Sequence, residues 1–244
     1  MSTTKNDIIR RLQHDILELQ GFEKPSPADA VDFGLGPINT SFPYQTFPTT
    51  AVHEFITESQ ETAAASAGFI AGLAGHLMQK GGACIWISSN RLLNPSALIQ
   101  FGIPPEQVVF IDVRNQKQVL WAVEEALSSE GLAAVIGEVK EIDFTASRRL
   151  QLAVEKSRTT GFLVRDRPRD LNANACVARW RIRPLASVSV DDFPGVGFTR
   201  WSVELLRVKN GHAGSWEMEW IAGRFQPVLP EKAISIHERP RKIV

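Results

Sequence analysis

The side chains that most often carry acid–base chemistry or bind metals are scattered along this sequence. His53 and Glu54 are adjacent, but no second histidine or cysteine stands at a spacing that would complete a metal site. Cys84 and Cys176 each lie in an apolar run, which is typical of buried free thiols in a reducing cytoplasm. No Ser-His-Asp arrangement is indicated either. We therefore expect no catalytic residue, no metal and no cofactor.

A basic stretch from Lys140 to Arg183 has the composition needed to bind phosphates. It holds eleven basic and five acidic residues, a local charge of +6, although the net charge of the whole chain is zero. Within it, Arg165, Arg167 and Arg169 stand at an expected strand end and in the loop that follows. Arginines in such a loop can follow a DNA backbone. A solvated edge or a surface for an acidic protein fits the same residues, and the sequence leaves these alternatives open.

Alternating apolar strands and helices position these residues and predict a parallel sheet buried on both faces. The expected strands are 51–56, 83–88, 108–112, 132–138 and 160–165, and the expected helices are 63–79, 94–101, 116–130 and 147–157. After residue 174 the pattern changes, because strands 175–183, 199–209 and 215–221 alternate in polarity and a hairpin-type NGHAG loop joins the last two. The expected fold class is α/β, a twisted and mostly parallel sheet flanked by helices, with antiparallel edge strands near the C-terminus.

The N-terminal region differs from this core. Residues 5–20 predict an amphipathic helix, and its apolar stripe consists of Ile8, Leu12, Ile16 and Leu19. The helix either docks on the domain or is offered to a partner, and the sequence favours neither. Residues 22–50 are rich in proline and have no strong period, which predicts a linker and an irregular loop.

The C-terminal residues 227–244 are bounded by prolines and end basic, with Arg239, Arg241 and Lys242. This tail is too short to fold alone, so we expect a flexible end or a segment that becomes ordered on a partner. The chain is accordingly divided into residues 1–32 (helix and linker), 33–226 (core domain) and 227–244 (tail).

Length and composition fit one globular domain with short appendages, since 244 residues can bury one sizeable core. The N-terminus lacks the apolar core of a signal peptide, and no later stretch reaches the ~18 apolar residues of a membrane span. The expected location is the cytoplasm, without a membrane partner.

An ordered set of segments resembles the RecA-like ATPase core and, within that superfamily, the ImuA family of mutasome accessory proteins. The segments are VHEF (52–55), GGACIWIS (81–88), RLLNPSALIQFGIP (91–104), LWAVEEAL (120–127), LAAVIGEV (132–139), DFTASRRLQLAVEKS (143–157), RWSVELLRVKNG (200–211) and WEMEW (216–220). The resemblance covers about residues 33–226 and implies a RecA-like fold.

The sequence departs from a RecA-like ATPase at the residues that would bind and hydrolyse ATP. The loop 56–68 has no glycine before Gly68 and no lysine, and no Lys or Arg occurs from residue 25 to 79. Asn90 stands where such an ATPase has the carboxylate that activates water, and an amide cannot take up that proton. Glu138 alone could serve, as the acidic residue that helps to hold magnesium. The resemblance with these departures predicts a protein that is not an enzyme.

The ImuA resemblance implies an accessory role in damage-induced, error-prone translesion synthesis as part of the SOS response. The implied partner is ImuB, an inactive polymerase-like subunit of the Y family, with indirect links to the error-prone replicative-type polymerase and the sliding clamp. The tail and the helix stripe are the expected partner-binding segments, and RecA, single-stranded DNA and a second copy are further candidates. Two alternatives remain: a SulA-like inhibitor of cell division that binds the tubulin-like division protein, and an ATPase with an atypical nucleotide site.

Overall fold

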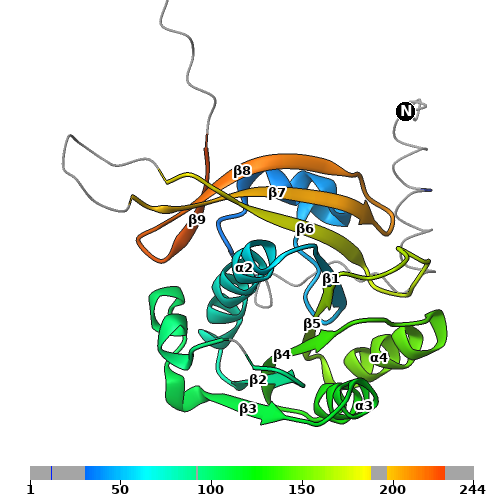
Figure 1. The fold of residues 1–244 in the computed structure, drawn as a ribbon. Coiled ribbons are helices and arrows are strands. Elements are labelled where there is room, and N and C mark those ends of the chain that lie inside the picture. Colours follow the sequence, from blue (N-terminus) through cyan, green and yellow to red (C-terminus); the bar gives the residue numbers. More distant parts are fainter. Residues whose placement is uncertain (1–11, 13–30, 92, 188–196, 229–244) are drawn as a thin grey trace, which may run out of the picture.

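A twisted nine-stranded sheet forms the centre of the computed structural model, which describes residue 12 and residues 31–91, 93–187 and 197–228 (Figure 1). The strand order in that part of the chain is β3-β2-β4-β5-β1-β6-β7-β8-β9. The strands are β1 (Val52–Thr57), β2 (Ala83–Ser88), β3 (Val108–Asp112), β4 (Leu132–Val139), β5 (Thr160–Asp166), β6 (Ala178–Leu185), β7 (Thr199–Val208), β8 (Gly214–Ile221) and β9 (Arg224–Pro227). The first six are parallel, and β7, β8 and β9 join them antiparallel, which confirms the predicted fold class.

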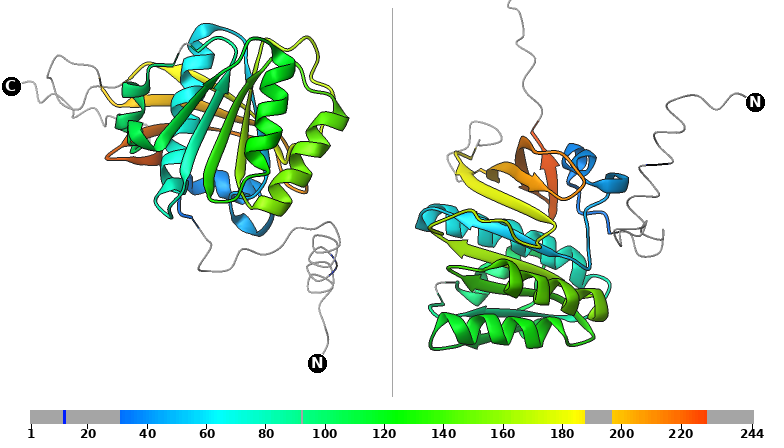
Figure 2. Two further views of the ribbon diagram at one scale, coloured as in Figure 1. Left: turned by 90° about the horizontal axis from the view of Figure 1, so that it is seen from below. Right: turned by 90° about the vertical axis from the view of Figure 1, so that its right-hand side faces the viewer.

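Three α-helices and four short 3-10 helices accompany the sheet in the described ranges. They are η1 (Gly36–Ser41), η2 (Pro43–Gln45), α2 (Gln60–Met78), η3 (Pro95–Phe101), η4 (Pro105–Gln107), α3 (Gln116–Leu127) and α4 (Phe144–Ser157). The helices α3 and α4 cover one face of the sheet, and α2 covers the other (Figure 2). Each face therefore has its own apolar core, as a sheet of parallel strands requires.

The helix α2 is buried around nearly its whole circumference, because the antiparallel strands curve over it (Figure 2). Small residues on α2 allow this close approach. A Cβ atom added to Gly72 would lie 2.6 Å from the ring of Phe225 and 2.8 Å from the ring of Trp220. The inward-facing tryptophans of the antiparallel strands are thus part of the core, as expected for aromatic residues on half-buried strands.

Residues 31–50 are irregular, as predicted, but they pack on the core and so correct the expectation of a linker. The segment contains the two short helices η1 and η2, and it packs against the α2 face of the sheet. Its buried apolar residues are Phe33, Leu35, Ile38, Phe42 and Phe47. The irregular backbone hides this role in the sequence, because the apolar residues follow no helical or strand period.

Most residues predicted for the two ends lie outside the described part of the chain. These are Ile8, Ile16, Leu19, Arg239, Arg241 and Lys242. Leu12 is described, and 55% of its surface is exposed. Among the described helices, none is long and apolar enough to cross a membrane. The division of the chain into three parts stays a prediction.

Candidate functional site

The turn between β1 and α2 occupies the position where a RecA-like ATPase would hold phosphates. Only Glu58 and Ser59 separate the end of β1 from the start of α2. The hydroxyl of Thr62 accepts hydrogen bonds from the backbone N–H groups of Glu58 and Ser59, both at 2.9 Å. The Ser59 hydroxyl accepts one from the N–H of Thr62 at 3.3 Å, which completes a capping box. Three N–H donors around this turn, those of Glu58, Ser59 and Thr62, are therefore already bound by the chain itself.

The charges around this turn oppose phosphate binding as well. The carboxylate of Glu58 lies 3.1 Å from Arg181 and 3.9 Å from Arg183, both on β6. These arginines also pair with Glu204 on β7, at 3.1 and 2.6 Å. Since each cation already has carboxylate partners, the strand ends offer no spare positive charge at the start of α2.

Glu138, the expected magnesium ligand, is engaged in a different contact. Its carboxylate accepts a hydrogen bond of 2.7 Å from the indole N–H of Trp86 on β2. Burial raises the pKa of Glu138, the Trp86 hydrogen bond lowers it, and the negative charges of Asp166 and Asp112 raise it further. One of its carboxylate oxygens is therefore already bound by the chain, and Glu138 fills a structural role beside Trp86. Asn90 is exposed two residues beyond the end of β2.

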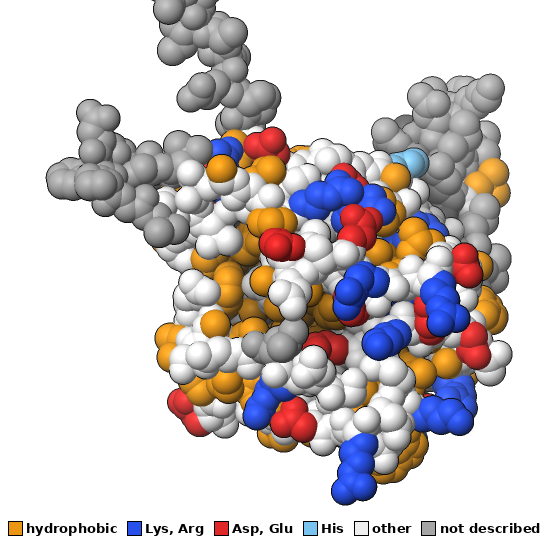
Figure 3. Space-filling model, in the orientation of Figure 1, with side chains coloured by type: hydrophobic (Ala, Val, Ile, Leu, Met, Phe, Trp, Pro, Cys, Tyr) orange, Lys and Arg blue, Asp and Glu red, His pale blue; other side chains and the backbone are white. Residues whose placement is uncertain are grey.

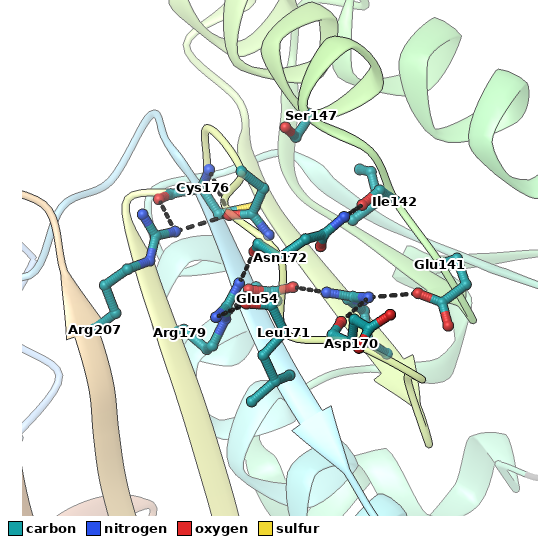
Figure 4. Close-up of polar contacts among 12 residues, drawn as sticks. Glu54, Glu141, Ile142, Ser147, Asp170, Leu171, Asn172, Cys176, Arg179 and Arg207 are labelled. Atoms are coloured by element: carbon teal, nitrogen blue, oxygen red, sulfur yellow. Dashed lines mark hydrogen bonds and ion pairs between the residues drawn. The ribbon is translucent and has the colours of Figure 1, made fainter.

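A buried ionic cluster lies on the face of the sheet that α4 covers (Figure 4). Glu54 accepts hydrogen bonds from Arg165 on β5 at 2.6 Å and from Arg179 on β6 at 2.5 Å. The side chains of Glu54 and Arg165 are fully buried, and Arg165 also donates to Glu141 at 2.7 Å. Burial alone would raise the pKa of Glu54, but hydrogen bonds from Arg165, Asn174 and Arg179 lower it. The cluster is thus a charged group held ionised inside the fold.

This ionic cluster fixes the connection between β5 and β6, residues 167–177. Arg165 donates to the backbone carbonyl of Asp170 at 3.1 Å, and Arg179 donates to those of Leu171 and Asn172 at 3.1 and 2.6 Å. From the other side, Glu141 accepts the backbone N–H of Arg169 at 2.8 Å. The loop is therefore held against the sheet by buried side chains along much of its length (Figure 4).

The structure separates the three arginines that we predicted to contact DNA. Arg165 points inward and is wholly buried, so its guanidinium has no surface to offer a phosphate, and that expectation is corrected. The physical reason is that side chains alternate between the two faces of the sheet along β5, and this places Arg165 on the same face as Glu54. Arg167 and Arg169 are exposed in the loop, and Arg167 pairs with Asp166 at 3.1 Å. Contact of these two with DNA stays a prediction.

His53 points to the α2 face, away from Glu54. It is stacked on Phe47 at 4.4 Å between ring centroids, its Nε2 lies 2.7 Å from the carbonyl of Pro48, and its Nδ1 accepts the indole N–H of Trp180. Burial lowers the pKa of His53 to about 4, so the ring is neutral at pH 7. His53 thus holds residues 47–48 in place. In the described ranges no three His, Cys, Asp or Glu side chains could hold a metal ion together.

The sequence contained a signal for the ionic cluster that our interpretation of the sequence missed. Glu54 lies in the middle of a strand that is buried along its whole length, and a charge in such a place needs a partner of opposite charge. The partners Arg165 and Arg179 are 111 and 125 residues away, so the pairing depends on β1 lying between β5 and β6.

Known proteins of two kinds are similar in sequence to this chain. No protein-family model matches the chain. It is 34% identical over 206 residues to the protein ImuA of two strains of Caulobacter vibrioides, which covers 80% of this chain and 84% of that relative. It is also 27% identical over 97 residues to the cell division inhibitor SulA of Photorhabdus laumondii, 40% of this chain and 54% of that relative.

Proposed function

The chain belongs to the ImuA family, and from this we propose that it is a non-catalytic accessory protein of damage-induced, error-prone translesion DNA synthesis. It acts by binding the polymerase-like mutasome subunit ImuB and so joins the assembly that contains the error-prone polymerase and the sliding clamp. The similarity extends over most of both chains, which supports a role in the mutasome and the damage response for this protein as well.

The closed turn between β1 and α2 is the observation that carries the non-catalytic part of the proposal. A phosphate loop needs several free backbone N–H groups and a lysine. Here two residues connect strand and helix, and hydroxyl groups of the chain accept hydrogen bonds from the N–H groups of Glu58, Ser59 and Thr62. Opening this turn to admit a triphosphate would break the capping box and bring phosphate charge next to Glu58.

Calorimetry with ATP and magnesium tests this part directly. We expect no heat of binding for the full chain at millimolar ATP, and no release of phosphate. A micromolar dissociation constant would overturn the non-catalytic proposal and favour an ATPase with an atypical site.

Gel filtration tests the partner. The full chain mixed with its polymerase-like subunit is expected to elute as one stable complex, and two separate peaks would contradict the proposal. The variant Leu12→Asp places a charge in the predicted helix stripe and is expected to weaken the complex. Leu152→Asp on α4 is its matched control, because Leu152 is 50% exposed and Leu12 is 55% exposed. Replacing Arg239, Arg241 and Lys242 by Glu tests the tail in the same assay.

Contact with single-stranded DNA is the second part of the proposal, supported by the exposed positions of Arg167 and Arg169 on a fixed loop. The double variant Arg167→Ala with Arg169→Ala is expected to weaken binding of a labelled oligonucleotide and to reduce its salt dependence. Arg148→Ala with Arg149→Ala on α4 is the control. On the face drawn in Figure 3, basic and acidic side chains lie beside one another, so we expect weak binding at physiological salt.

The partial similarity to SulA supports one alternative, inhibition of cell division through the tubulin-like division protein. Overexpression separates the two functions. Filamentous growth without increased mutagenesis would favour the SulA-like function, whereas increased damage-dependent mutagenesis without filaments is expected for the mutasome function.

A further inference from the structure

The two outer edges of the sheet differ in what lies beside them. At the β9 edge, the backbone of the chain itself runs close by, since a Cβ atom on Gly34 would lie 2.5 Å from the carbonyl oxygen of Phe225. At the other edge, β3 is the terminal strand, and no strand of the described ranges pairs with its outer side. β3 is labelled at the lower edge of the sheet in Figure 1. An open edge is a template for pairing with another strand.

The backbone N–H and C=O groups of β3 point alternately toward β2 and away from the sheet. Val113 donates its N–H to Ser88 at the end of β2, so Ile111 and Val109 direct their N–H groups toward β2 as well. The N–H and C=O groups of Phe110 and Asp112 consequently point away from the sheet. These are the groups that an added strand would bind.

The side chains of β3 give this open edge little protection, since Asp112 is its one charged residue. Natural edge strands carry lysine, proline or a bulge that prevents pairing. The sequence of β3 is VVFID, with regular pairing to β2, and the half-exposed Val109 presents 52% of its surface to solvent. Arg91 lies over the ring of Phe110 at 5.2 Å from its centroid and pairs with Asp112 at 3.4 Å, so it covers a side-chain face and not the backbone edge.

We propose that β3 pairs antiparallel with β3 of a second copy of this chain, with the two-fold axis at Phe110. This arrangement is isologous and closes as a dimer, whereas a parallel addition of one copy to the next would not close at this edge. Phe110 then faces Phe110 of the other copy in a pair that exchanges both hydrogen bonds.

The residue pattern of β3 fits a second copy of itself. In this register Val109 lies opposite Ile111 of the other copy, and both are β-branched residues that pair well across strands. Asp112 lies opposite Val108 of the other copy, so the single charged residue of the strand does not meet its own copy. The exposed surface of Val109 is covered by pairing, which gives the strand an apolar contact on the α3 face.

Sedimentation of the full chain over a range of concentrations tests the proposal. We expect a monomer–dimer equilibrium, and Val109→Lys is expected to weaken the dimer at least ~10-fold because it places a charge opposite Ile111. Val109→Thr keeps a β-branched side chain and is expected to retain most of the dimer. Leu12→Asp is a further control of similar exposure, which separates β3 pairing from association through the N-terminal helix.

Disulfide crosslinking tests the register. Phe110→Cys places two thiols opposite one another at the axis, where the Cα atoms of such a pair are ~5.5 Å apart and a disulfide can form. Val109→Cys is the matched control, because its own copy lies two residues out of register. The natural Cys84 and Cys176 give no background, since both are buried and burial raises each pKa to about 12.

Three outcomes would overturn the proposal. One is a monomer at every concentration, and another is a dimer that Val109→Lys leaves intact. The third is crosslinking of Val109→Cys that is as fast as that of Phe110→Cys. Loss of dimerisation in Leu12→Asp alone would assign self-association to the N-terminal helix instead. Because none of these measurements uses the mutasome subunit, their failure is independent of the proposed function.

Discussion

His53 and Glu54 are neighbours on β1, yet they fix two different segments on opposite faces of the sheet. On the α2 face, His53 holds residues 47–48 through ring stacking and a hydrogen bond, and it does so as a neutral group. On the α4 face, Glu54 holds the loop 167–177 through two arginines, and it does so as a charge. The comparison teaches that a buried polar residue is stable either when it loses its charge or when it gains charged partners.

Removing the charge from Glu54 is expected to lower the free energy of unfolding more than any other change proposed for these two residues. Glu54→Gln leaves Arg165 and Arg179 buried without their shared carboxylate, and breaking such a pair costs about 3–5 kcal/mol. Urea unfolding measures this loss in the free energy of unfolding. Glu141→Gln is the control, because Glu141 bonds the same Arg165 but is 49% exposed. We expect its cost to stay below about 1 kcal/mol, and equal costs for the two variants would contradict the account of the cluster.

Lowering the pH is expected to change the stability contributions of His53 and Glu54 in two different pH ranges. The folded pKa of His53 is about 4, against an ordinary value of 6.5, so only the unfolded chain takes up this proton between those values. The free energy of unfolding therefore falls by about 3 kcal/mol as the pH drops from 6.5 to 4. The pKa of Glu54 is lowered below its ordinary 4.5, so its contribution is lost only as the pH falls further.

The variant His53→Gln isolates the first of these pH effects. It should remove the loss between pH 6.5 and 4 and keep the loss at lower pH, as followed by urea unfolding at each pH. A pH dependence identical to that of the unmodified chain would show that His53 does not titrate as described.

The strands of the sheet could be predicted from the sequence, but their neighbours could not. The bounds of β2 and β3 agree with the prediction to the residue, because apolar runs between glycine, proline and polar residues define them. The strand β9 was missed, since RFQP is four residues long and ends in proline. Alternation predicts that strands are parallel, but only the fold places β1 between β5 and β6, and the ionic cluster depends on that order.

The candidate site was predictable where it depended on local sequence. The missing lysine and glycines before α2 predicted the absence of a phosphate loop, which stays a prediction, and the structure adds that only two residues join β1 to α2. Arg165 was predicted wrongly as a DNA contact because a run of arginines suggests a surface. Its inward direction follows from the partner that it finds on another strand.

Adding a methyl group to the tightly packed helix α2 is expected to have the next largest effect on stability. Gly72→Ala would bring a Cβ atom to 2.6 Å from Phe225 and 2.8 Å from Trp220, and overpacking of this kind costs about 1–3 kcal/mol. Gly68→Ala is the matched control on the same helix, because its Cβ would lie 3.1 Å from the ring edge of Phe101. The smaller overlap needs a smaller shift of the neighbouring ring, and alanine stabilises a helix by about 1 kcal/mol relative to glycine. Thermal unfolding should therefore rank Gly72→Ala well below Gly68→Ala, and the reverse order would contradict the close packing of α2.

The smallest expected effect concerns the turn where β1 meets α2. Ser59→Ala removes a capping hydroxyl, and a lost cap of this kind costs about 1 kcal/mol. Asn115→Ala is the control, since the Asn115 side chain caps α3 in the same way, with a bond of 3.1 Å to the N–H of Gln118. If the β1–α2 turn serves only to start a helix, the two variants lose similar stability in urea unfolding and neither acquires affinity for ATP. If Ser59→Ala bound ATP while Asn115→Ala did not, the hydroxyl would be the feature that keeps phosphate out. A phosphate site that one side chain blocks would reopen when that side chain is removed, whereas a site whose binding residues are missing would not. We therefore expect Ser59→Ala and Asn115→Ala to lose similar stability and to remain without affinity for ATP.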